Sequence, residues 1–270
     1  MSSVQKRLAA GLKAILPIAV TQRLQAWWQD AAIRRLLLWP PFGAVASHDL
    51  LRRTSPISRL YGADRGNAID RYYIEDFLAR HANDIRGVVL EIQDDAYTKR
   101  FGKNLVKRSE VLSVSPGSKV TIVADLTSAD QIPSSTFDCI ILTQTLQYIY
   151  DLPAAVRTIY RILAPGGVLL ATVPGICAIG PESWPCYWSF RPASVERLIA
   201  DAFPGGSVCV ESAGNVLAAI AFLHGLALEE VDRTALDVHD PAYPVVVCVR
   251  AVKMIDGAGL DGPGGLSPRN

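Results

Sequence analysis

The sequence predicts an α/β protein with a mainly parallel sheet that is covered by helices on both faces. Two observations predict it: short apolar runs without strict polar–apolar alternation, and helical segments that separate these runs. Alternation is lost in such strands because both of their faces are buried. The 270 residues are 50% hydrophobic and 20% charged, which is ordinary for a globular protein. We expect one main domain with additions.

The apolar runs predict seven strands. They are VVLEI at 88–92, EVLSV at 110–114, VTIVADL at 120–126, FDCIILT at 137–143, VLLATVP at 168–174, VCVES at 208–212 and PVVVCVRAVK at 244–253. The helices expected among them are IDRYYIEDFLARH at 69–81, LPAAVRTIYRIL at 152–163 and PASVERLIADAF at 192–203. The second helix should end at APGG, where proline blocks continuation and glycine accepts a positive φ.

Both ends of the chain are expected to lie outside the main domain, which we place at 61–253. Residues 1–60 are basic, contain three tryptophans and are interrupted by WPPFG, so they predict a helical extension. Lys13 breaks the apolar start and no small-residue cleavage site follows, which favours an amphipathic helix over a signal peptide. That helix could pack on the domain, or contact a membrane surface or a partner. Residues 254–270 are rich in glycine and predict a flexible tail.

Charge and cysteine content narrow the functional classes. A formal net charge of +1 gives no reason to expect nucleic acid as a partner. The five cysteines form no CxxC pair and have no histidine cluster beside them, so we expect reduced thiols, no metal site and a cytoplasmic location. Cys139, Cys209 and Cys248 lie in apolar runs and are expected to be buried.

The most specific sequence block runs from Ala124 to Gly175. It has an acidic residue after the third strand, then Ile-Pro, then Phe-Asp opening the fourth strand, a helix ending in Pro-Gly-Gly and a strand ending in Val-Pro. This order resembles the class I S-adenosylmethionine-dependent methyltransferases over residues 80–253. The resemblance implies a Rossmann-like fold and S-adenosylmethionine as the cofactor. Ligands in such sheets lie beyond the carboxyl ends of the strands.

The loop after the first strand departs from the family pattern, acid-x-Gly-x-Gly-x-Gly. Aligning Glu91 on the acid puts Gln93, Asp95 and Tyr97 at the three glycine positions. A turn that needs a positive φ is then strained or rebuilt, and the Gln and Tyr side chains would occupy space normally taken by methionine and ribose. Ser115 stands where the family has the acid that holds the ribose hydroxyls, and one hydroxyl cannot offer two carboxylate oxygens.

Two interpretations of this altered site stay open. In the first, cofactor is bound through changed contacts: Asp94 or Asp95 serves the ribose or the ammonium group, and Asp125 with Leu126 frames the adenine. In the second, the fold survives as a catalytically inactive binding or scaffold protein. The residues expected at the cofactor site are Glu91, Gln93, Asp94, Asp95, Ser115, Asp125, Leu126 and Gln144.

The acceptor is suggested by the upstream segment GADRGNAIDRYYIEDFL at 62–78. It resembles a bacterial subgroup associated with surface polysaccharide assembly, which implies O-methylation of a sugar or glycan and a glycosyltransferase as a partner. Within it, Arg65 and Arg71 could bind the cofactor carboxylate or an anionic sugar nucleotide, or form ion pairs with Asp64, Asp70 or Glu75.

The loop after the fifth strand contains Trp184, Tyr187 and Trp188. They are suited to stacking on sugar faces, and the alternative is packing against the sheet edge. Sugar O-methylation also needs a base for the hydroxyl proton. His224 is the catalytic candidate, although a histidine that ends a helix is equally favoured there by the helix dipole. His239 is a second candidate, or part of a turn.

Overall fold

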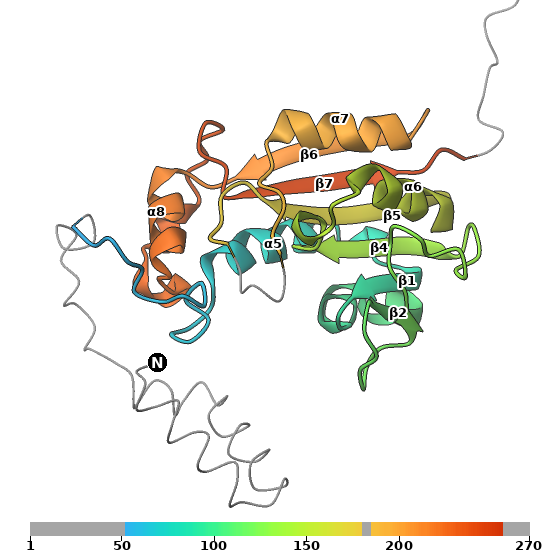
Figure 1. Cartoon of the computed structure of the whole chain (residues 1–270), viewed down its shortest axis with the longest axis horizontal. Coiled ribbons are helices and arrows are strands. Elements are labelled where there is room, and N and C mark those ends of the chain that lie inside the picture. Colours follow the sequence, from blue (N-terminus) through green and yellow to red (C-terminus); the bar gives the residue numbers. More distant parts are fainter. Residues whose placement is uncertain (1–51, 180–184, 256–270) are drawn as a thin grey trace, which may run out of the picture. The chain divides into compact units, whose positions relative to one another are not determined.

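The computed structural model describes residues 52–179 and 185–255 (Figure 1). These fall into two compact units: the smaller holds 52–69 and 221–233, and the larger holds the rest. Most of the predicted N-terminal extension, the predicted tail and Trp184 lie outside the described residues. The domain bounds of 1–60, 61–253 and 254–270 therefore stay a prediction.

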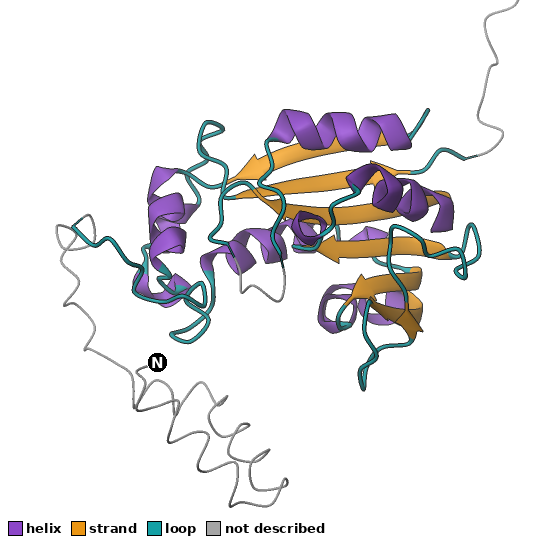
Figure 2. Cartoon of the chain, in the orientation of Figure 1, coloured by secondary structure: helices purple, strands orange, loops and turns teal. Residues whose placement is uncertain are grey.

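The larger unit is built on one seven-stranded sheet (Figure 2). Its strands are β1 Gly87–Ile92, β2 Val106–Ser113, β3 Ile122–Val123, β4 Phe137–Thr143, β5 Leu163–Pro174, β6 Ser207–Ala213 and β7 Val246–Val252. They lie in the order β3-β2-β1-β4-β5-β7-β6, and β7 alone runs antiparallel to its two neighbours. This arrangement confirms the predicted Rossmann-like, mostly parallel sheet.

Helices α6 Leu152–Ile162 and α7 Pro192–Ala202 cover one face of this sheet, and α5 Ile69–Arg80 lies on the other face. The chain also forms α8 Val216–His224 and α9 Arg233–Leu236. Figure 1 shows α6 and α7 beside each other over β5, β6 and β7. Side chains alternate along β7, so Val249 and Ala251 join the core on the α6 and α7 side, while Arg250 points to the other face and meets Asp84, just after α5.

A cap fixes the start of α6, where the chain enters from the loop after β4. The carboxylate of Asp151 accepts a hydrogen bond from the Ala154 amide at 3.0 Å, and Pro153 lies in the first turn. The helix then buries Ala155, Val156 and Ile159 completely. Helix α6 therefore begins at Leu152, the residue predicted from the sequence.

The predicted end of α6 at APGG is wrong in one respect. Leu163 is already extended, and β5 begins there, so the Pro-Gly-Gly residues belong to the strand. Gly166 has a φ of +75° and its amide donates to the carbonyl of Lys253 at 3.0 Å, while Lys253 donates to Gly167 at 2.9 Å. Pairing with the chain after β7 thus replaces the expected loop. The third strand is also shorter than predicted, with two residues instead of seven.

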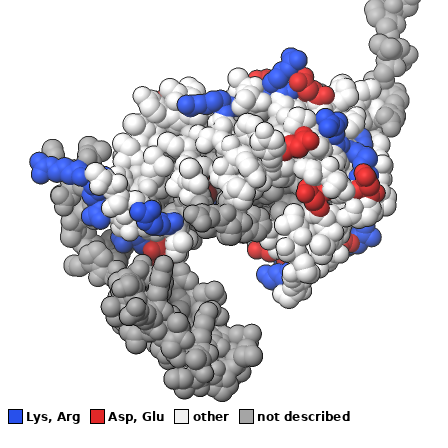
Figure 3. All heavy atoms as spheres, in the orientation of Figure 1, with Lys and Arg blue, Asp and Glu red and all other residues white. Residues whose placement is uncertain are grey.

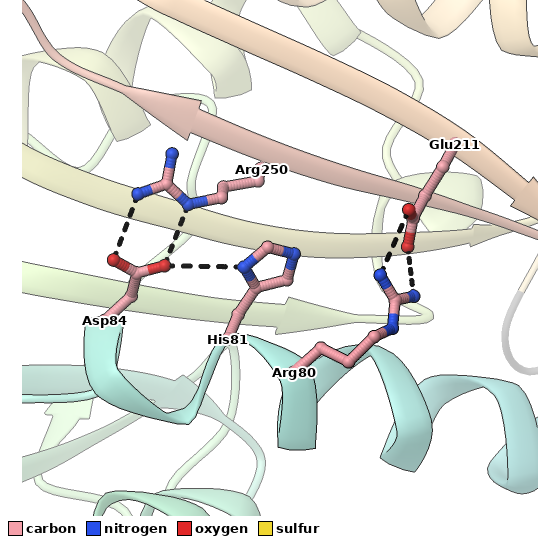
Figure 4. A network of polar contacts seen from close by, with 5 residues as sticks. All are labelled: Arg80, His81, Asp84, Glu211 and Arg250. Carbon is pink, nitrogen blue, oxygen red and sulfur yellow. Dashed lines mark hydrogen bonds and ion pairs between the residues drawn. The ribbon is translucent and has the colours of Figure 1, made fainter.

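An ion-pair network ties the end of α5 to the antiparallel strands (Figure 4). Arg80 pairs with Glu211 of β6, and Arg250 of β7 forms a two-bond pair with Asp84, at 2.8 and 3.1 Å. The Nδ1 atom of His81 lies 3.6 Å from the same Asp84 carboxylate. Burial lowers the pKa of His81 below its usual value of 6.5.

The thiols partly match expectation. Cys139 and Cys248 are buried, and burial raises the pKa of both thiols. Cys209 is exposed, which corrects the prediction from its apolar run. Its neighbours Val208 and Val210 pack against the core, so Cys209 points to the opposite face of β6, where it is exposed.

Candidate functional site

A cavity of about 610 Å³ lies at the carboxyl ends of β1, β2 and β4. This is the position at which open α/β sheets bind ligands, and the volume lies in the range of small-molecule sites. The lining residues all belong to the larger unit. They are Arg71, Glu91, Ile92, Gln93, Asp94, Tyr97, Leu112, Ser113, Val114, Ser115, Ala124, Asp125, Leu126, Thr143, Gln144, Thr145, Tyr148, Ile149 and Pro185.

Gln93 keeps the backbone geometry that a glycine would have in this turn. Its φ is +74°, and its amide donates to the carbonyl of Leu112 at 3.0 Å. A left-handed conformation costs a non-glycine residue roughly 1–2 kcal/mol. A strained turn, one of the two outcomes expected from the sequence, is therefore present at Gln93.

Glu91 holds the loop that follows. Its side chain is 3% exposed and accepts hydrogen bonds from the amides of Tyr97, at 3.1 Å, and Thr98, at 2.8 Å. Burial raises the pKa of this carboxyl, and the bonds from Thr98 and Tyr97 oppose the rise. Glu91 thus lines the cavity and also holds the following loop in place through these two hydrogen bonds.

Tyr97 lines the wall of the cavity. Its side chain is largely buried, its hydroxyl accepts a hydrogen bond from Arg71, and the guanidinium carbon lies 5.7 Å from the ring centroid. Its ring also stacks on Phe101, with centroids 6.0 Å apart. These contacts fix the ring, and they place the cationic Arg71 at the mouth of the cavity.

The two neighbouring strand ends supply polar groups. Asp125 follows β3 and is exposed; its Oδ1 accepts from the amide and the hydroxyl of Thr127, both at 2.8 Å. Leu126 beside it is buried. Ser115 is exposed beyond the end of β2, and its amide donates to the hydroxyl oxygen of Ser113 at 3.3 Å.

Gln144 ends β4 in a second left-handed conformation, with a φ of +46°. Its backbone amide donates to Thr172 at 2.8 Å, but its side-chain Nε2 is buried and has no hydrogen-bond partner among the described residues. Buried polar groups are normally paired, so this amide is a donor that a ligand would satisfy. The left-handed turn, the Asp125 carboxylate and this donor together fit a nucleoside-containing cofactor.

The structure brings together seven of the eight predicted cofactor residues. Asp95 is the exception, because its carboxylate pairs with Lys99 at 2.7 Å and it is not among the residues that line the cavity. Thr145, Tyr148, Ile149 and Pro185 were missed. The residue types of these four positions do not indicate a binding site. Only their position in the chain after β4 and β5 could have predicted that they line the cavity.

The remaining predicted residues have different settings. Arg65 belongs to the smaller unit and pairs with Glu230, its Nε lying 3.0 Å from Oε2, rather than with the three acids expected as alternative partners. His224 is in the same unit; its carbonyl accepts from Ile57 at 2.8 Å and its buried Nδ1 has no partner among the described residues. Neither residue lines the cavity, and the catalytic role of His224 stays a prediction.

Tyr187 and Trp188 lie beside the cavity loop that follows β4. The Tyr187 amide donates to the carbonyl of Gln147 at 2.8 Å, and the Trp188 indole donates to Ile149 at 2.9 Å.

Surface charges of both signs are mixed in the described part of the chain. On the right of the view in Figure 3, basic and acidic side chains lie next to one another.

Residues 77–171 match the family described as the methyltransferase domain, a segment that runs from α5 into β5. The match covers about a third of the chain, and it agrees with a Rossmann-like methyltransferase domain over that segment, as the strand order does. It supports the predicted S-adenosylmethionine-dependent methyltransferase, and S-adenosylmethionine as the cofactor. No curated protein matches the sequence.

Several solved structures with a similar backbone are described as methyltransferases, and another is described as the [4+2]-cyclase SpnF; all of these have low sequence identity to this chain. One is an S-adenosylmethionine-dependent methyltransferase from Archaeoglobus fulgidus, with 11% identity, 68% of this chain and 94% of that chain covered, and a TM-score of 0.47. Another, from Mesorhizobium loti, has 16% identity, coverages of 69% and 98%, and a TM-score of 0.46. The N-methyltransferase NodS from Bradyrhizobium japonicum WM9, in complex with S-adenosylhomocysteine, has 15% identity, coverages of 76% and 97%, and a TM-score of 0.45. At these values the likeness does not extend to activity or substrate.

Two further properties concern the described part of the chain. Within residues 52–179 and 185–255, none of the helices has the length and apolar character needed to span a bilayer. The same residues contain no group of three or more His, Cys, Asp or Glu side chains placed to hold a metal ion.

Proposed function

We propose that the protein transfers a methyl group from S-adenosylmethionine to a hydroxyl of a sugar or glycan intermediate in surface polysaccharide assembly. The observation that carries the donor side is the cavity at the strand ends, where Gln93 and Gln144 have a left-handed backbone conformation. The acceptor side is supported by the resemblance of 62–78 and by the aromatic residues beside the cavity.

Different residues of the cavity would contact different parts of the cofactor. Asp125 and Leu126 would frame the adenine, Ser115 and Asp94 would serve the ribose hydroxyls, and Arg71 would offer a cation to the carboxylate. The Glu91 contacts keep this loop in place before ligand arrives. Positioning of this kind supplies much of the rate of a bimolecular transfer.

When bound, S-adenosylmethionine supplies a methyl group on a positively charged sulfur, and the acceptor oxygen takes this group as its proton passes to a base. His224 is the candidate that the sequence offers for that base, but it belongs to the smaller unit and does not line the cavity. The cavity itself therefore supplies binding and positioning, and the base stays unassigned.

Calorimetry with S-adenosylmethionine and S-adenosylhomocysteine tests the donor site. We expect Asp125→Ala to lose binding by at least about tenfold, since it removes a charged acceptor from the cavity wall. Asp125→Asn should retain part of the affinity, because the amide oxygen can still accept from Thr127. Asp130→Ala, an exposed position that does not line the cavity, is the matched control. Unchanged binding in Asp125→Ala would show that the pocket is misplaced.

Absence of heat with the unaltered protein at millimolar ligand would instead favour the alternative, a catalytically inactive scaffold partner of a glycosyltransferase. The strained glycine-free turn is the feature that favours this second function. A pull-down of the partner in the absence of any ligand binding would distinguish the two.

We place the reaction in the cytoplasm, with peripheral membrane contact through residues 1–40. This segment is basic and carries all three of its region's tryptophans, which suits an anionic lipid surface. Flotation with vesicles containing anionic lipid should retain the full chain and lose a variant without residues 1–40. Neutral vesicles are the control, and equal flotation of both proteins would contradict the idea.

A further inference from the structure

Three large aromatic side chains are exposed together beside the cavity. Tyr150 is 72% exposed, Tyr187 48% and Trp188 37%. The Tyr150 ring lies 5.4 Å from that of Tyr187 in an edge-on arrangement and 6.1 Å from that of Trp188 in a stacked one, centroid to centroid. We refer to these three residues as the aromatic platform. Single exposed apolar residues are ordinary, whereas a contiguous group marks a binding surface.

The aromatic platform is held in place by backbone contacts between two loops. The Trp188 indole nitrogen donates to the Ile149 carbonyl at 2.9 Å, and the Tyr187 amide donates to Gln147 at 2.8 Å. The Phe190 amide donates to Pro174 at the end of β5, at 3.0 Å. Because the indole donor is already used inside the protein, Trp188 offers a ligand its ring rather than a hydrogen bond. Because these side chains are already held in place, little conformational entropy is lost when a ligand binds to them.

The aromatic platform continues the wall of the cavity. The cavity is lined by Tyr148, Ile149 and Pro185. Tyr150 directly follows Ile149 in the chain, and Tyr187 is two residues after Pro185. A molecule that rests on the aromatic platform is therefore adjacent to the donor site. Tyr150 is its central member, since it contacts both other rings.

We propose that the aromatic platform is the acceptor subsite and that Tyr150, Tyr187 and Trp188 bind one face of a sugar ring. The inference rests on the proposed function and specifies its substrate class. The ring of Tyr187 stands at 69° to that of Tyr150, whereas the ring of Trp188 is at 27°. Tyr187 and Tyr150 therefore do not offer two parallel faces to a flat aromatic molecule, and a puckered ring with C–H groups on its face can contact rings at such an angle. The phenol groups remain for the hydroxyls at the edge.

Saturation-transfer NMR tests the subsite with the methyl glycosides of glucose, galactose, mannose and rhamnose, and with 4-hydroxybenzoate as a flat aromatic probe. Spectra are recorded with and without S-adenosylhomocysteine. We expect at least one glycoside to bind through the C–H groups of one ring face. Tyr150→Ala should weaken that binding by about fivefold to tenfold, and Tyr150→Phe by no more than about twofold, since stacking survives.

Tyr243→Ala is the matched control, because Tyr243 is a half-exposed tyrosine that is not part of the aromatic platform. S-adenosylhomocysteine binding is measured for each variant by calorimetry. If no glycoside binds, if Tyr150→Ala binds glycosides as well as the unaltered protein, or if 4-hydroxybenzoate binds in preference to all of them, the subsite is refuted even where cofactor binding is intact. Loss of cofactor binding in the unaltered protein would instead refute the proposed function, while the glycoside spectra still decide the subsite.

Discussion

At the scale of single residues, Gln93 shows that a turn can keep its shape while it loses the residue type that normally allows it. Its left-handed φ is the geometry for which glycine is favoured, and the side chain lies at the cavity. Four other described non-glycine residues share a positive φ, and Gln144 is the second of these that lines the cavity. Backbone strain of this kind is concentrated at functional sites.

Replacing Gln93 by Gly should relieve this strain, and replacing it by Ala should not. Both changes remove the same side chain beyond Cβ, so their difference isolates the backbone conformation. We expect Gln93→Gly to have a free energy of unfolding about 1 kcal/mol higher than Gln93→Ala. Urea unfolding of the two variants measures this difference. Equal stabilities would mean that the turn is not left-handed in solution.

At the scale of elements, the Asp151 cap sets where α6 begins, and α6 in turn carries part of the core. The carboxylate accepts from the Ala154 amide, which would otherwise be an unpaired donor of the first turn. We expect Asp151→Ala to reduce the free energy of unfolding by about 1 kcal/mol, and Asp151→Ser to recover most of it. Thermal and urea unfolding provide the measurement. A loss of the same size in both variants would assign the effect to something other than the cap.

The sequence predicts elements well where the pattern is local. Phe137–Thr143 is β4 with the bounds that its apolar run indicates, and α6 begins at its predicted residue. APGG was assigned to a helix end because glycine and proline signal one, but pairing with Lys253, far along the chain, makes it a strand. Long-range pairing of this type leaves no local trace.

The same distinction explains the site. Strand order alone places Glu91, Asp125 and Gln144 at one sheet edge, so these could be predicted. The contact of Arg71 with Tyr97 and the pairing of Asp95 with Lys99 depend on side-chain directions, which the sequence does not specify. Tyr150 was missed because its neighbours in the aromatic platform come from another loop.

At the scale of the whole larger unit, ion pairs connect the sheet's antiparallel side with α5. His81 lies among Asp84, Arg250, Arg80 and Glu211, and burial lowers its pKa from 6.5. The unfolded chain therefore binds a proton at a higher pH than the folded protein does. Stability should consequently fall as pH decreases below about 6.5 and be retained above it.

Comparison with His81→Gln isolates this effect from the other histidines. The free energy of unfolding of the unaltered protein, measured in urea, should fall more steeply between pH 7.5 and about pH 5.5 than that of the variant. The arginine partners remain charged throughout this range, so they do not contribute to the difference. Parallel pH profiles for the two proteins would show that His81 titrates alike in the folded and unfolded states.

The position of β7 also has a consequence for biosynthesis. β7 lies between β5 and β6, so β6, made earlier, has no other strand to pair with. While the chain emerges from the ribosome, the backbone groups of β5 and β6 that pair with β7 stay unpaired until residues 246–252 have left the exit tunnel. A premature stop codon upstream of Val246 would release a protein in which β5 has an open edge and β6 has no partner strand, and chaperones and proteases should treat it as misfolded.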